Sequence, residues 1–182
     1  MVYVLLRRAP IAVVLSGLLL SLAGCGEDED PLTVRGTVDV TLDGTRTGFE
    51  FATDTHIDDD RVAPADGRVA GHCTLSKSAD GETSVISVGI VRPTVSAEDT
   101  GVRSFVIRVD DPREPARGAV TAELGADTFT ATATDAGCTI EVTYLDVDGG
   151  AVGLRSECAI TSGTKTASSV SELELSGCSQ TY

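Results

Sequence analysis

Aspartates and one histidine cluster in a single short segment of the sequence: Asp54, His56, Asp58, Asp59 and Asp60. Carboxylate oxygens in a flexible loop are the ligands that Ca²⁺ takes, at roughly six to eight oxygens per ion. The four aspartates are therefore the candidate metal ligands, and Ca²⁺ is the candidate cofactor. A solvated acidic loop is the alternative, because adjacent aspartates cannot all point at one ion. Strand periodicity is missing from 53–66, so we expect a loop that carries function there.

A second candidate chemistry is hydrolysis by paired carboxylates. Glu172 and Glu174 alternate along an expected strand and so share one face, although ordinary solvent-facing glutamates have the same spacing. The chain has only two histidines, so a nucleophile activated by histidine has few candidates. We expect a protein that is not an enzyme. The alternative is a small hydrolase that uses Glu172, Glu174 or Asp58.

The N-terminal segment has the order of features found in export signals. Arg7 and Arg8 supply positive charge, residues 11–20 form a short apolar run, and Leu22-Ala23-Gly24-Cys25 follows. This order resembles the signal peptide and lipobox of bacterial lipoproteins. The resemblance implies that residues 1–24 are removed, that a diacylglyceryl group alkylates the Cys25 thiol, and that its new amino group is acylated. An ordinary secretory signal with a chance cysteine is the alternative.

The residues that follow Cys25 bear on location. Residues 25–31 are acidic and without apolar side chains, which is typical of a tether, and they precede one expected domain at 32–182. Gly26 stands where many inner-membrane lipoproteins of Gram-negative bacteria carry an aspartate. The resemblance therefore implies a lipid-anchored protein of the outer membrane that faces the periplasm or the cell surface.

The net charge narrows the range of partners. The net charge of the chain is −14, and loss of Arg7 and Arg8 with the signal peptide brings the net charge of the mature protein to −16. A field of that sign repels phosphate backbones and anionic head groups, so we expect no nucleic-acid partner. We expect acyl chains to supply the attachment to the membrane instead. The mature chain has no Trp and only Tyr144 and Tyr182 as tyrosines, which weakens a sugar-stacking platform. The sequence leaves open whether the partner is a protein or a glycan.

Four cysteines remain after Cys25: Cys73, Cys138, Cys158 and Cys178. An even number of cysteines in an exported domain predicts two disulfides. A zinc site would need close pairs such as Cys-x-x-Cys, which the spacing does not provide. Free buried thiols are the remaining alternative.

The dominant hydrophobic period of the mature chain is two, which predicts half-buried strands. Asp43-Gly44 fits a two-residue type I′ turn, and closing it places Val38 opposite Phe49 and Gly36 opposite Phe51. Further strands are expected at 67–77, 82–92, 101–110, 117–124, 127–134, 138–146, 150–161 and 169–177. The predicted fold class is all-β, an antiparallel β-sandwich of about ten strands, with a β-barrel as the alternative.

Alternation over 138–158 predicts one hairpin and one of the two disulfides. A three-residue loop, Val147-Asp148-Gly149, would place Gly149 in the left-handed conformation. Counting outward gives the opposed pairs Asp146–Gly150, Tyr144–Val152, Val142–Leu154, Glu141–Arg155, Ile140–Ser156 and Cys138–Cys158. Directly opposed cysteines are close enough for a disulfide. The register therefore predicts Cys138–Cys158 and leaves Cys73–Cys178 by elimination.

These features favour an envelope-anchored lipoprotein that acts as a binding or structural module without catalysis. The alternatives are the small hydrolase and a Ca²⁺-stabilised adhesion domain.

Overall fold

The structure, a computed structural model, describes residues 31–59, 69–77, 84–92, 101–113 and 115–181. The expected signal peptide 1–24, the lipidated Cys25 and the tether up to residue 30 lie outside the described residues, and so does Asp60. In the described part of the chain, no helix is long and apolar enough to cross a membrane.

Strands make up most of the described chain, which confirms the all-β class. Twelve strands are assigned within the described residues: β1 (Thr33–Leu42), β2 (Thr45–His56), β3 (Asp58–Asp59), β4 (Ala70–Lys77), β5 (Ser84–Val91), β6 (Val102–Asp111), β7 (Arg117–Leu124), β8 (Asp127–Thr132), β9 (Cys138–Asp146), β10 (Ala151–Ser162), β11 (Lys165–Ser176) and β12 (Ser179–Thr181).

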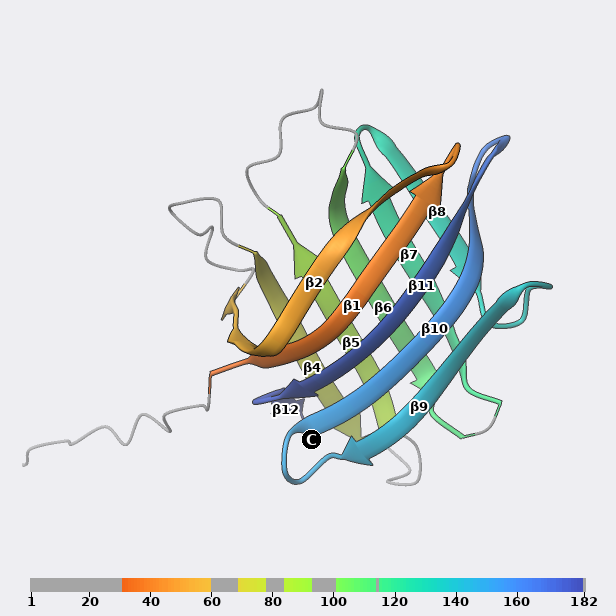
Figure 1. The fold of residues 1–182 in the computed structure, drawn as a ribbon. Coiled ribbons are helices and arrows are strands. Elements are labelled where there is room, and N and C mark those ends of the chain that lie inside the picture. The colour runs from red at the N-terminus through yellow and green to blue at the C-terminus, as the bar shows by residue number, and fades with distance from the viewer. Residues whose placement is uncertain (1–30, 60–68, 78–83, 93–100, 114, 182) are drawn as a thin grey trace, which may run out of the picture.

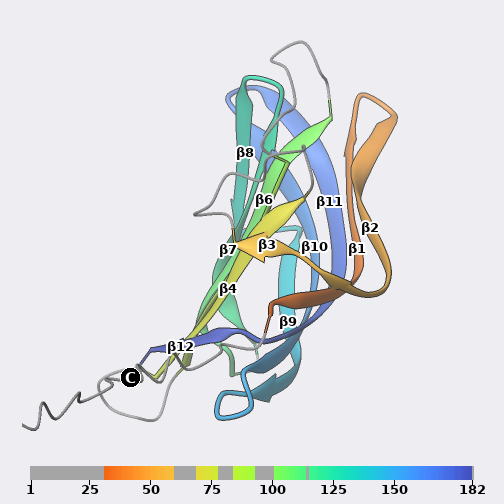
Figure 2. The same cartoon turned by 90° about the vertical axis from the view of Figure 1, so that its left-hand side faces the viewer.

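The strands belong to one sheet that folds over into two layers (Figures 1 and 2). The first layer has the order β9-β10-β11-β1-β2 and the second the order β12-β4-β5-β6-β7-β8. The layers join where β8 pairs with β10 through the single residue pair Thr130–Thr161. Along the described strands the path of neighbours ends at β12 and β2, so the sheet does not close into a barrel. The predicted sandwich is confirmed.

Two short ladders differ from the expected antiparallel arrangement. β3 and β12 each run parallel to β4. Both are short continuations of strands from the first layer, β2 and β11, that cross to the second layer (Figure 2). The sheet is therefore mixed. The same continuation corrects the loop prediction over 53–59, because Thr53–His56 extend β2 and Asp58–Asp59 form β3, while residues 60–66 lie outside the described residues.

The β1–β2 hairpin follows the register predicted from the sequence. Asp43 and Gly44 both have positive φ, at 51° and 80°, as a type I′ turn requires. Val38 lies opposite Phe49, and Gly36 lies opposite Phe51. The two phenylalanines are buried, with ring centroids 6.4 Å apart, and contribute to the core between the layers.

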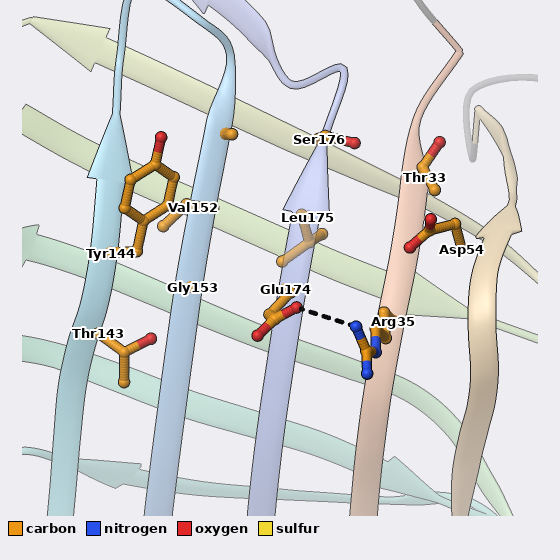
Figure 3. Close-up of a pocket in the computed structure, with 11 residues that line it drawn as sticks. Thr33, Arg35, Asp54, Thr143, Tyr144, Val152, Gly153, Glu174, Leu175 and Ser176 are labelled. Carbon is orange, nitrogen blue, oxygen red and sulfur yellow. Dashed lines mark ion pairs between the residues drawn. The ribbon is translucent and has the colours of Figure 1, made fainter.

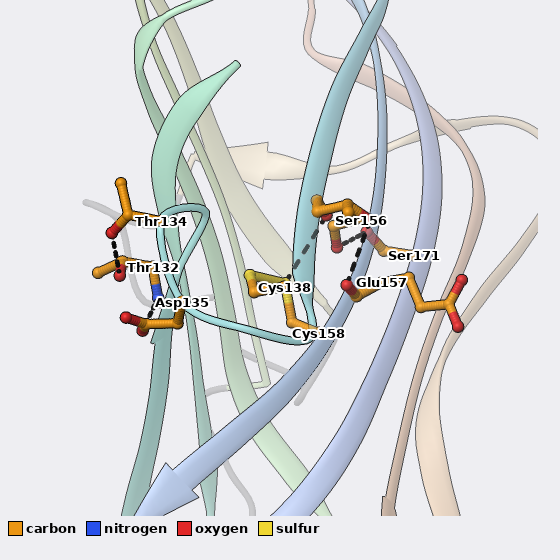
Figure 4. Close-up of a disulfide and its surroundings, with 9 residues drawn as sticks. Thr132, Thr134, Asp135, Cys138, Ser156, Glu157, Cys158 and Ser171 are labelled. Atoms are coloured by element: carbon orange, nitrogen blue, oxygen red, sulfur yellow. Dashed lines mark hydrogen bonds between the residues drawn. A yellow bond between two sulfur atoms is a disulfide. The ribbon is translucent and has the colours of Figure 1, made fainter. Parts of the chain in front are cut away.

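The core contains a few hydroxyl groups among its apolar side chains. Ser156, Ser169 and Ser171 are buried on the inner faces of β10 and β11. The Ser156 and Ser171 Oγ atoms lie 2.8 Å apart and share a hydrogen bond (Figure 4). The Ser169 hydroxyl has no hydrogen-bond partner among the described residues. The hydrogen bond between Ser156 and Ser171 therefore offsets the cost of removing their hydroxyls from water, whereas no described residue offsets that cost at Ser169.

Both predicted disulfides are present. Cys138 and Cys158 are bonded, with Cα atoms 3.9 Å apart (Figure 4), and Cys73 and Cys178 are bonded, with Cα atoms 4.7 Å apart. The first joins the two strands of one hairpin. The second spans 105 residues and fastens the end of the chain, beside β12, to β4 in the second layer.

Four of the six opposed pairs predicted for β9 and β10 are correct, and the two nearest the loop are wrong. Cys138–Cys158, Ile140–Ser156, Glu141–Arg155 and Val142–Leu154 are opposed as predicted. Beyond Leu154 the register shifts by one residue, so that Tyr144 lies opposite Gly153 and Asp146 lies opposite Ala151. The loop has four residues, 147–150, instead of three. Gly150, with φ 63°, takes the left-handed position that was assigned to Gly149.

Candidate binding site

A row of side chains crosses the outer face of the first layer. The registers place Tyr144 opposite Gly153, Gly153 opposite Glu174, and Glu174 opposite Arg35. The four residues come from β9, β10, β11 and β1. Because opposed residues in an antiparallel sheet project on the same side, the row brings together positions far apart in the sequence.

Two irregularities in the sheet flank this row. In the β9–β10 ladder, Thr143 has no opposed residue, since Val142 faces Leu154 and Tyr144 faces Gly153. The extra residue turns Tyr144 to the outer face, where 56% of it is exposed. In the β1–β2 ladder, a second shift occurs between Val34 and Gly36. Bulges of this kind re-aim side chains, and both lie at the level of the row.

The row borders a shallow hollow of about 280 Å³, here called the Tyr144 hollow (Figure 3). It is lined by Thr33, Arg35, Asp54, Thr143, Tyr144, Ala151, Val152, Gly153, Glu174, Leu175 and Ser176. Gly153 lies between Tyr144 and Glu174 in the row and has no side chain, and the Thr143 hydroxyl packs against its Cα, where a larger residue would clash with it (Figure 3). The volume of the hollow lies just below the range for small-molecule sites, roughly 300–1,000 Å³.

Charged groups occupy the side of the hollow away from Tyr144. The Arg35 Nη1 and Glu174 Oε2 atoms lie 4.0 Å apart, and the two side chains are 63% and 71% exposed. An ion pair this exposed adds little stability, so both groups can exchange their partner for a ligand at low cost. Asp54 adds a second carboxylate at the end of the row.

The Tyr144 hydroxyl is held by an acidic neighbour. It donates a hydrogen bond of 3.4 Å to Asp146 Oδ2. Partial burial and the Asp146 charge raise the pKa of Tyr144 above its ordinary value. The phenol therefore stays protonated at neutral pH, and the ring presents an apolar face with a polar tip.

The predicted metal ligands are only partly covered by the described residues. Asp54 lines the hollow, whereas Asp58 and Asp59 lie on β3, and Asp60 is outside the described residues. Among the described residues, no group of three or more histidine, cysteine, aspartate or glutamate side chains is placed to hold a metal ion. The Ca²⁺ site stays a prediction.

Of the carboxylates proposed for a hydrolase, one lines the hollow. Glu172 and Glu174 both project outward from β11, but only Glu174 lines the hollow. Asp58 does not line it either. Glu174 is exposed and faces the Arg35 cation.

Sequence reasoning missed Arg35, Gly153 and the outward position of Tyr144. Alternation alone assigned Tyr144 to the buried face, and only the bulge at Thr143 reverses it. The adjacent glycines Gly149 and Gly150 were the available signal, because they allow a longer loop.

Comparison of the chain with protein-family models, with curated proteins and with solved structures found no significant match.

Proposed function

We propose that this protein is a lipid-anchored, non-catalytic binding module of the bacterial outer membrane that holds a glycan in the Tyr144 hollow. The observation that carries the proposal is the exposed Tyr144 ring at one side of the hollow, with Arg35 and Glu174 on the far side. An aromatic face packs against the C–H groups of a sugar ring, and a guanidinium and a carboxylate bond its hydroxyls.

The anchoring part of the proposal rests on the resemblance of Leu22-Ala23-Gly24-Cys25 to a lipobox. Labelling cells with an acyl-chain probe is expected to label the protein and to find it in the outer-membrane fraction. The Cys25→Ala variant is expected to lose both the label and the membrane. A Cys25→Ala protein that is still labelled contradicts the anchor.

The binding part is tested by titrating the full-length protein in detergent with cellotetraose and chitotetraose. We expect NMR shifts at the Tyr144 and Gly153 amides, together with at least a tenfold weaker Kd for Tyr144→Ala and for Glu174→Gln. Glu172→Gln is the matched control, because it removes the same charge from the same strand face outside the hollow. If neither glycan shifts these amides, or if the control weakens binding equally, the hollow is not a site for these glycans.

A further inference from the structure

One edge of β9 is open. β9 pairs with β10, and no other described strand pairs with it. β8 lies along the same edge of β10 but pairs with it only through Thr130 and Thr161. The rest of β8 pairs with β7 in the second layer. The two strands therefore diverge, and their divergence leaves β9 with an unpaired side.

The register identifies which backbone groups of β9 face the open side. The Ala159 N–H donates to the Gly137 carbonyl, so these two opposed residues form a hydrogen-bonded pair. Hydrogen-bonded and non-hydrogen-bonded pairs alternate along an antiparallel ladder. Ile140 and Val142 therefore occupy non-hydrogen-bonded positions, and their N–H and C=O groups point away from β10.

The start of β9 agrees with this assignment. Cys138 occupies the same kind of position as Ile140, and its N–H donates away from β10, to the Asp135 carbonyl at 3.3 Å. Among the described residues, Ile140 and Val142 pair with no strand other than β10, and no turn or loop hydrogen bond uses their backbone groups. This edge therefore offers a row of donors and acceptors to a further strand.

A groove of about 480 Å³ runs beside this edge. Its described lining is Pro115, Ala116, Ala133, Cys138, Thr139, Ile140 and Glu141. Glu141 is the only charged side chain in that lining. The described lining of the groove is thus mostly apolar, with a single carboxylate.

The wall opposite β9 is fixed by an ion-pair cluster. Asp111 accepts hydrogen bonds from Arg113 at 2.8 Å and from Arg117 at 2.7 Å, and these bonds hold the pKa of its carboxyl well below the usual range. The cluster ties together the two ends of the connection that contains Pro115 and Ala116. The groove therefore has a defined wall before any ligand arrives.

We infer that the open edge of β9 binds an extended peptide segment of a protein partner by strand addition. Backbone groups of Ile140 and Val142 would supply the hydrogen bonds, and every second side chain of the segment would enter the apolar groove. A Lys or Arg of the segment opposite Glu141 would complete a cross-strand charge pair. The partner segment thus alternates small apolar residues with basic or polar ones.

Charge argues against a second copy of this chain as the occupant. Two mature chains that carry −16 each repel one another, whereas the same field attracts a basic segment. The site is separate from the Tyr144 hollow, and neither proposal depends on the other.

The test uses the full-length protein in detergent and the synthetic peptide Thr-Val-Lys-Val-Thr-Val-Lys-Val-Thr. Val142→Pro removes one N–H from the open edge without removing a bond to β10, and proline is tolerated at such edge positions. Val142→Thr, of similar shape, keeps the N–H and is the matched control. We expect Val142→Pro to weaken the peptide Kd at least tenfold and Val142→Thr to change it less than threefold.

A second measurement needs no variant. Peptide added to the wild-type protein is expected to slow hydrogen exchange of the Ile140 and Val142 amides at least tenfold. The amides of Thr139 and Glu141, which face β10, should change little. The proposal would be overturned if both variants bound the peptide equally well, or if exchange slowed at all four amides alike. A wild-type dimer that Val142→Pro turns into a monomer would also overturn it, because that result would identify a second copy of the chain as the occupant.

Discussion

Loss of the Cys73–Cys178 disulfide is expected to destabilise the protein more than loss of Cys138–Cys158. The perturbation is a pair of double variants, Cys73→Ala with Cys178→Ala and Cys138→Ala with Cys158→Ala, so that neither protein carries an unpaired cysteine of the broken bridge. All four cysteines are at most 5% exposed. The packing lost on truncation is therefore similar in the two variants, and the comparison isolates the cross-link.

The magnitude follows from the length of chain that each bridge closes in the unfolded state. A separation of 105 residues gives about 4.8 kcal/mol, and a separation of 20 residues gives about 3.3 kcal/mol. The difference of about 1.5 kcal/mol is a measurable fraction of the ~5–15 kcal/mol that usually separates folded from unfolded chains. The longer bridge also holds β12 against β4, where Ser76 and Thr181 hydroxyls lie 2.7 Å apart.

The assay is equilibrium unfolding in guanidinium chloride without reductant, with the slope of each transition compared to that of the wild type. Equal slopes allow the free energies to be subtracted directly. An equal loss of stability in the two variants, or a greater loss for Cys138–Cys158, would refute the reasoning that the length of the closed loop sets the contribution of each bridge.

Three further outcomes are expected. Ser171→Ala should lower the free energy of unfolding by about 1–3 kcal/mol, because it leaves the buried Ser156 hydroxyl without its partner, whereas Ser169→Ala should cost nothing in the same denaturation assay. Asp111→Asn should lower Tm at neutral pH, because the ion pairs of the Asp111 carboxylate depress its pKa and stabilise the folded state. The higher Tm of the wild type should be fully present above about pH 5 and should decline as the pH falls below about 4. A difference in Tm that does not depend on pH would contradict this cause. A Ca²⁺ site at Asp54, Asp58, Asp59 and Asp60 predicts a Tm that rises in millimolar Ca²⁺ and falls again with chelator, and an unchanged Tm excludes a stabilising site.

Local patterns in the sequence determined most of the fold. Alternating apolar residues predict strands because each strand buries one face, and the Asp43-Gly44 turn fixes the β1–β2 register because both residues adopt positive φ. Cys138–Cys158 follows from counting along one hairpin, since both cysteines lie on the side of the bulge where the count is correct. These features depend on residues close together in the chain.

The Tyr144 hollow and the open edge of β9 were decided by tertiary structure. A three-residue and a four-residue loop both suit the sequence around Gly149 and Gly150, and the choice depends on the end of the chain. The Gly150 carbonyl accepts a hydrogen bond from the Cys178 N–H at 2.9 Å, and a disulfide fixes Cys178 to Cys73. The longer loop is compensated by the bulge that turns Tyr144 outward. No local pattern contains this information, because the contact that selects the loop joins residues that only the folded sandwich brings together.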